Sequence, residues 1–194
     1  MSHATTNAPA TEAPPINLIY LVWSGLALAT MIVVINLDNV WPLKFMHVMA
    51  GVLWTGIDLF MGFVLGPILR TAPFETRKAI ITRLTPKTLF IMPTLSIITG
   101  TTGWFHAKQL GFLDMPWPQY GWVAGALAII TILSVQGMGY LLPTNLRVYL
   151  ELRKPNPDGA KIGRLMSGFF YVVAFQGCMQ IAIIVIMTKF ATGL

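Results

Sequence analysis

The strongest constraint in this sequence is a series of five long apolar stretches. They cover residues 17–37, 43–69, 88–108, 120–144 and 164–190. A helix of about 20 apolar residues spans the hydrocarbon core of a bilayer, where every backbone polar group must find its partner within the protein. The sequence therefore predicts an all-α fold: a polytopic membrane helical bundle with five transmembrane helices.

The composition supports a protein with little mass outside the membrane. Hydrophobic residues make up 55% of the 194 residues and charged residues only 10%, whereas soluble domains contain about 25% charged residues. Residues 1–16 are rich in Ala, Thr and Pro, which predicts a disordered N-terminal tail. We expect residues 17–194 to form a single transmembrane bundle domain.

The basic residues predict the orientation of the bundle. The net charge is +6, and most of the 13 Lys and Arg residues lie around the second and fourth connections between the apolar stretches. Lys and Arg are enriched in cytoplasmic loops, so this asymmetry predicts a cytoplasmic N-terminus and a C-terminus on the outer side. We expect these charges to face lipid headgroups, and we expect no nucleic acid partner.

The second apolar stretch contains an unusual row of polar groups. At about 100° per residue, His47, Gly51, Trp54 and Asp58 share one stripe of a helix, and Lys44 borders it. Polar groups inside a membrane are costly and usually face other helices, a ligand or water. The stripe therefore predicts a buried site on this helix.

Two histidines fall at similar depth in the predicted topology. His47 lies near the outer end of the second span, and His106 lies near the outer end of the third. Paired imidazoles on adjacent helices are typical axial ligands of a haem iron. Gly51 and Gly103 would leave space for the porphyrin, while Lys44 and Lys108 could neutralise its propionates.

Other interpretations of these residues stay open. Each histidine could instead hydrogen-bond to a neighbouring helix, and His106 is close enough to the interface to extend toward water. Copper is an alternative to haem b, because Met46, Met49 and Met61 flank the stripe and thioethers bind Cu(I).

Asp58 is expected to act separately from the histidines. It lies about 16 Å farther along the helix than His47, which places it near the middle of the bilayer. We expect it to be protonated, to hydrogen-bond to Gln136, Gln176 or a threonine, or to contact water. It could transfer protons to a quinone or a haem, as a catalytic group, or it could simply join two helices.

The polar segment after the second span predicts an additional short helix. Phe74, Ile80, Ile81 and Leu84 could form one apolar face that lies on the inner membrane surface. Pro86 would then separate this interfacial helix from the third span.

Several short motifs are similar to those of a known superfamily. The run from Lys44 through His47 to Leu69 resembles the signature helix of the CopD-like superfamily, which includes copper-resistance membrane proteins and the haem-binding membrane protoporphyrinogen oxidase of bacteria. The segment PTLSIITG at residues 93–100 resembles the next helix of that superfamily. The last apolar stretch is similar to the final helix of several members.

The resemblance implies a haem b protein of the bacterial inner membrane, with His47 at the position of the motif histidine. It implies oxidoreductase or electron-transport activity, with quinone and a periplasmic or membrane redox partner as candidate reactants. The segment PQYGWVAGAL at residues 118–127 lacks the lysine that protoporphyrinogen oxidases carry there, so that enzyme activity is not favoured.

Two alternatives of other classes stay open beside the haem hypothesis. One is a CopD-like copper transport or resistance protein. The other is a structural subunit of a larger respiratory or photosynthetic complex, or of an oligomer.

Overall fold

A computed structural model describes residues 17–193, and all regular elements within this range are helical. The predicted tail at residues 1–16 lies outside the described residues. The elements are α1 (Ile19–Asn36), α2 (Val40–Leu59), η1 (Phe60–Leu65), α3 (Gly66–Thr71), α4 (Phe74–Gln109), η2 (Phe112–Asp114), α5 (Tyr120–Gln136), η3 (Gly137–Leu141), α6 (Leu142–Leu152) and α7 (Gly159–Ala191). The prediction of an all-α helical bundle is confirmed.

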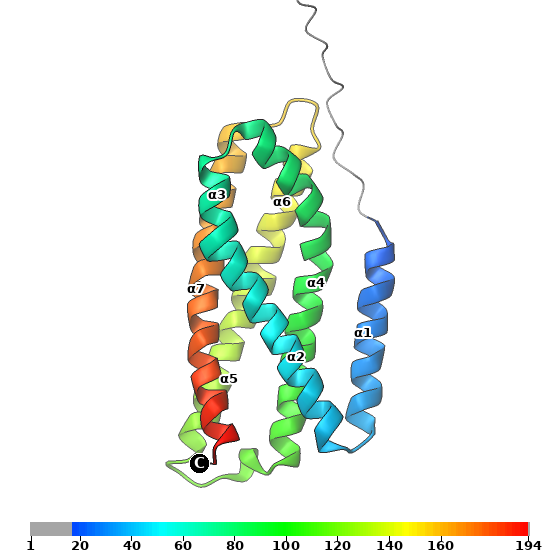
Figure 1. Cartoon of the computed structure of the whole chain (residues 1–194), viewed down its shortest axis with the longest axis vertical. Coiled ribbons are helices and arrows are strands. Elements are labelled where there is room, and N and C mark those ends of the chain that lie inside the picture. Colours follow the sequence, from blue (N-terminus) through cyan, green and yellow to red (C-terminus); the bar gives the residue numbers. More distant parts are fainter. Residues whose placement is uncertain (1–16, 194) are drawn as a thin grey trace, which may run out of the picture.

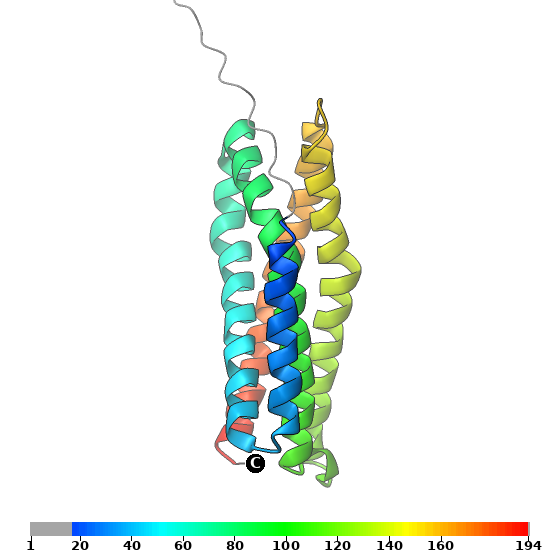
Figure 2. The same ribbon diagram turned by 90° about the vertical axis from the view of Figure 1, so that its right-hand side faces the viewer.

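The long helices run side by side along one axis (Figures 1 and 2). The segments α2, η1 and α3 form one continuous rod, and α5, η3 and α6 form another. α1 packs against α4 and α2 at one edge of the bundle, whereas α7 packs against α2, α5 and α6. α2 therefore has α4 on one side and α7 on another.

The chain reverses direction at the two ends of the bundle. The turn between α3 and α4 and the loop between α6 and α7 lie at one end (Figure 1). The α1–α2 turn, the α4–α5 connection and the end of α7 lie at the opposite end. The two basic connections thus share one end, as the sequence predicted; which side of a membrane this end faces stays a prediction.

Four helices are long and apolar enough to cross a membrane, judged by length and composition. They are Ile19–Asn36, Val40–Thr71, Tyr120–Leu152 and Gly159–Ala191. Since each is rich in exposed apolar side chains, a lipid bilayer is their natural surroundings. α4, which contains the predicted third span, is not among them, so the count of five spans stays a prediction.

The separate interfacial helix expected near residues 74–84 does not form. α4 is instead one continuous helix of 36 residues with Pro86 and Pro93 inside it. Ile81, Thr85 and Pro86 are buried, and the Thr85 hydroxyl donates a hydrogen bond to Asn145 Oδ1 of α6 at 3.0 Å. These contacts offset the cost of proline inside a helix, which is about 3 kcal/mol.

Close contact between α2–η1 and α7 depends on glycine. A Cβ atom added at Gly62 would lie 2.8 Å from Ala174 Cα, and one added at Gly177 would lie 2.8 Å from Leu59 Cδ2. Small residues let membrane helices approach until their backbones touch, and this maximises van der Waals contact. The two glycines, one on each helix, therefore set the spacing of this pair.

Both π-helical segments come just before a proline. The Gly66 N–H donates to the Met61 carbonyl, and the Leu142 N–H donates to the Gly137 carbonyl, each five residues back. Pro67 and Pro143 follow directly. Proline has no N–H and its ring clashes with the carbonyl four residues earlier, so a wider turn lets each rod continue without a break.

The glycine contact predicts a strong asymmetry between two substitutions on the same rod. Gly62→Ala would force the Ala174 backbone away, and we expect a loss of about 1–3 kcal/mol of stability through overpacking. Gly56→Ala is the matched control, because a Cβ atom there would meet nothing within 4 Å. Thermal unfolding in detergent should show a lower midpoint for Gly62→Ala only; equal midpoints would contradict the tight α2–α7 contact.

Candidate functional site

The imidazole of His47 lies directly on the backbone of α4. A Cβ atom added at Gly103 would come within 2.7 Å of His47 Cε1, and one added at Gly51 would lie 3.5 Å from Thr99 Cγ2. Side chains larger than hydrogen at residue 103 would therefore push the imidazole away. Gly103 thus gives its space to the His47 ring, whereas a Cβ atom at Gly51 would make only an ordinary contact. Space for a porphyrin beside these glycines stays a prediction.

A hydrogen bond fixes the orientation of the His47 ring. His47 Nδ1 donates to the Thr99 carbonyl oxygen at 3.0 Å. Because a carbonyl oxygen only accepts, Nδ1 carries the proton and Nε2 of the neutral ring keeps its lone pair. This is the arrangement of a metal-ligating histidine, whose second nitrogen is held by a backbone carbonyl.

His106 lies close to His47, as the predicted topology required. The centroids of the two rings are 6.5 Å apart, and the ring planes differ by 33°. His106 is half-buried, and its Nδ1 atom is buried without a hydrogen-bond partner among the described residues. Two imidazoles on opposite sides of one metal ion, each about 2 Å from it through a ring nitrogen, would have centroids about 6 Å apart.

The two lysines that were predicted to neutralise haem propionates lie at the same end of the bundle as the two histidines. Lys44 and Lys108 are both exposed, and Lys44 is near enough to His106 for an electrostatic interaction. Among residues 17–193, neither lysine forms a salt bridge, since both salt bridges in this range involve Glu151. Their ammonium groups are free to meet an anionic group at this end.

The described residues contain no protein site for a bare metal ion with three or more ligands. Groups of at least three His, Cys, Asp or Glu side chains placed to hold a metal are absent from residues 17–193. The three methionines that favoured copper are also dispersed: Met46 packs near Met31 and α1, Met49 is exposed, and Met61 lines a different cavity. The imidazole pair alone provides two ligands, so any metal held there needs further donors.

Asp58 and Trp54 form part of a second polar site deeper along α2. Asp58 is 1% exposed and accepts a hydrogen bond from Gln180 Nε2 of α7 at 2.8 Å. The Trp54 indole N–H also donates to this carboxylate. Trp54 is therefore engaged with Asp58, two helical turns from His47.

The glutamine that bonds to Asp58 is Gln180 and neither of the two expected from the sequence. Gln176 donates instead to the Leu133 carbonyl at 2.8 Å, and the Gln136 side-chain oxygen is buried without a partner among the described residues. Gln176 and Gln180 are one turn apart on the same face of α7. Their choice of partner depends on how far α7 is shifted along α2, which the sequence does not specify.

A polar link near Asp58 was not predicted from the sequence. Asn145 of α6 accepts from Thr85 Oγ1 at 3.0 Å and donates through Nδ2 to Thr88 Oγ1 at 2.9 Å. Thr85, Thr88 and Asn145 are ordinary residues of membrane helices, and their spacing in the sequence gives no signal that they meet.

Comparison with family models, curated proteins and solved structures found no match. The likeness to the CopD-like superfamily therefore stays a sequence-based hypothesis.

The Asp58–Gln180 hydrogen bond predicts a measurable coupling between α2 and α7. In a double-mutant cycle with Asp58→Leu and Gln180→Leu, we expect a coupling energy of about 1–2 kcal/mol, as for hydrogen bonds inside membrane proteins or to charged groups. The same cycle with Gln176→Leu is the control, because Gln176 donates elsewhere. Chemical unfolding in detergent measures both cycles. A coupling for Gln176 as large as that for Gln180 would contradict the assigned partner.

Proposed function

We propose that this chain is a haem b-binding, multi-pass membrane protein that transfers electrons. The observation that carries the proposal is the pair of imidazoles, 6.5 Å between ring centroids, where α2 and α4 meet near one end of the bundle. His47 and His106 would be the axial ligands. A porphyrin supplies four nitrogens, which with two imidazoles complete six-coordinate iron.

The residues around the pair fit this cofactor chemically. The hydrogen bond from His47 to the Thr99 carbonyl presents an unprotonated Nε2 atom, and the buried Nδ1 atom of His106 has no competing partner in the described range. Lys44 and Lys108 could neutralise the propionates. Because the His47 ring is in contact with Gly103, the porphyrin cannot lie between these two residues.

The proposed chemistry is the exchange of single electrons. A haem held by His47 and His106 would supply one-electron redox chemistry. The protein residues would hold the iron, set its surroundings and exclude water. Quinone in the bilayer and a partner at the outer face are the proposed donor and acceptor.

The basic end of the bundle supports the proposed orientation. If this end faces the cytoplasm, as the positive-inside rule requires, the histidine pair lies near the outer face of a bacterial inner membrane. A copper protein is less well supported, because the methionines do not gather around the histidines.

The absorbance spectrum of the purified protein tests the proposal directly. We expect a Soret band and a reduced-minus-oxidised haem b spectrum. His47→Ala should abolish most of the haem content, and Gly103→Ala, by displacing the His47 ring, should weaken haem binding about 10- to 100-fold. Gly100→Ala is the matched control on α4, since its Cβ atom would only reach Ile130 Cγ1 at 4.0 Å. A wild-type protein that shows no Soret band and gives no haem on extraction would overturn the proposal.

The His106→Ala variant tests whether the iron has two histidine ligands or only His47. Loss of the second axial ligand should leave haem bound through His47 and change the iron from six-coordinate low-spin to five-coordinate high-spin. Resonance Raman or magnetic circular dichroism spectroscopy reports this change. An unaltered low-spin spectrum would remove His106 as a ligand while keeping His47.

A further inference from the structure

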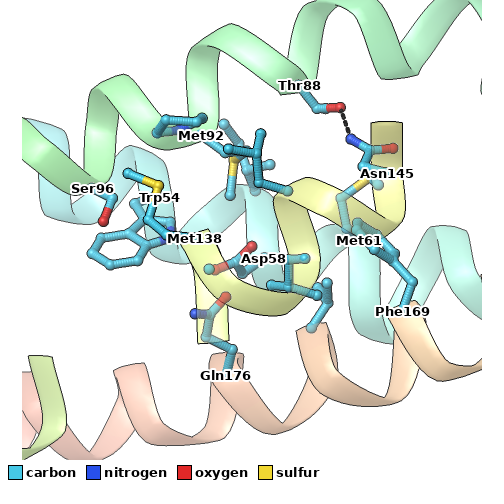
Figure 3. Close-up of a pocket in the computed structure, with 16 residues that line it drawn as sticks. Trp54, Asp58, Met61, Thr88, Met92, Ser96, Met138, Asn145, Phe169 and Gln176 are labelled. Carbon is cyan, nitrogen blue, oxygen red and sulfur yellow. Dashed lines mark hydrogen bonds between the residues drawn. The ribbon is translucent and has the colours of Figure 1, made fainter. Parts of the chain in front are cut away.

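A small cavity lies beside Asp58 in the middle of the bundle. It has a volume of about 60 Å³ and is lined by residues of α2, η1, α4, η3, α6 and α7. Figure 3 shows Asp58 among the lining side chains, with Gln176 extending toward it from α7. The cavity walls are mostly apolar, with a few polar groups, as is usual for small-molecule sites.

Among residues 17–193, the Asp58 carboxylate has no cationic partner. It receives N–H donors from Gln180 and Trp54, and neither group brings a full positive charge. Within residues 17–193, both salt bridges belong to Glu151, near the basic end of the bundle. A carboxylate in a low-dielectric interior requires a compensating charge, and here it must come from a bound cation or a proton.

The remaining polar groups of the cavity are suited to an ammonium ion. Asp58, Gln176 and Ser96 line the cavity, and each has side-chain oxygen that can accept a hydrogen bond. An ammonium group has three N–H donors to offer. Trp54 and Phe169 add aromatic rings to the walls, and such rings attract cations.

The size of the cavity limits what can enter. A volume of about 60 Å³ is well below the roughly 150 Å³ of a cavity that accepts benzene. An ammonium group with its first methylene fits this space, whereas an aromatic or quinone ring does not. The ligand must therefore be thin where it meets Asp58.

A groove on the surface of the bundle lies next to the cavity. Ser96 and Met138 line both spaces, and the groove continues between α4 and α5 along Gly100, Ser134 and Trp104. Trp104 is exposed on the outer surface of the bundle. The groove is open along its length, and its mostly apolar walls suit an alkyl chain.

Both π-helical segments contribute residues to the walls of the cavity. η1 contributes Met61, and η3 contributes Gly137, Met138 and Leu141. Such segments occur frequently at functional sites, and methionine side chains adapt to the shape of a ligand. The irregular backbone is thus concentrated where a ligand would bind.

We propose that this cavity binds the ammonium group of a long-chain primary amine, with Asp58 as its counter-ion and the alkyl chain in the groove between α4 and α5. This site is separate from the histidine pair and does not require the haem proposal. Asp58 and His47 are eleven residues apart on α2, about 16 Å at 1.5 Å per residue.

Binding of radiolabelled dodecylamine to the full chain in nanodiscs of zwitterionic lipid tests the inference, with empty nanodiscs subtracted. We expect saturable binding of one amine per chain. Dodecanol, which has the same chain and no charge, should not compete. Asp58→Asn should weaken binding about tenfold or more, because it removes a charge-assisted hydrogen bond.

Three further variants keep the test decisive if Asp58→Asn fails to fold. Ser134→Trp should fill the groove and weaken binding, whereas Gly139→Ala, with nothing within 4 Å of the added Cβ atom, should bind as the wild type does. His47→Ala should also bind the amine normally even if it loses haem, which separates the two proposals. Absence of saturable binding to the wild type would overturn the inference. So would binding by Asp58→Asn and Ser134→Trp that is as tight as that of the wild type.

Discussion

The close approach of α2 to its neighbours depends on positions that lack a side chain. On the α4 side, the His47 ring lies against Gly103, and on the α7 side the η1 segment meets the Ala174 backbone at Gly62. Lipid offers apolar side chains no less favourable surroundings than a protein interior does, so tight packing and hydrogen bonds must hold membrane helices together. Both polar sites lie where this packing brings α2 into contact with another helix.

The two sites on α2 use different neighbours and can act independently. His47 is oriented by the Thr99 carbonyl of α4, whereas Asp58 is held by Gln180 of α7. A shift of α7 along α2 would exchange the partner of Asp58 but would leave the imidazole pair intact. The separation allows one helix to carry a proposed cofactor site near its end and a proposed cation site near its centre.

The polar stripe was the most informative part of the sequence. Helical periodicity placed His47 and Asp58 on the inward side of one helix, and the structure has both of them in contact with other helices. The partner of Asp58 and the course of α4 could not be obtained in the same way. Pro86 is a local signal for a helix end, but its burial and the bond from Thr85 to Asn145 keep α4 continuous.

The sequence by itself determined the helical class, the two basic connections and the inward position of the stripe, because these follow from hydropathy, charge and helical periodicity. Only the tertiary structure decided the spacing of the histidines, the partner of Asp58 and the cavity with its groove. These depend on the crossing and relative depth of whole helices, which glycine contacts and long-range hydrogen bonds set between residues far apart in the chain.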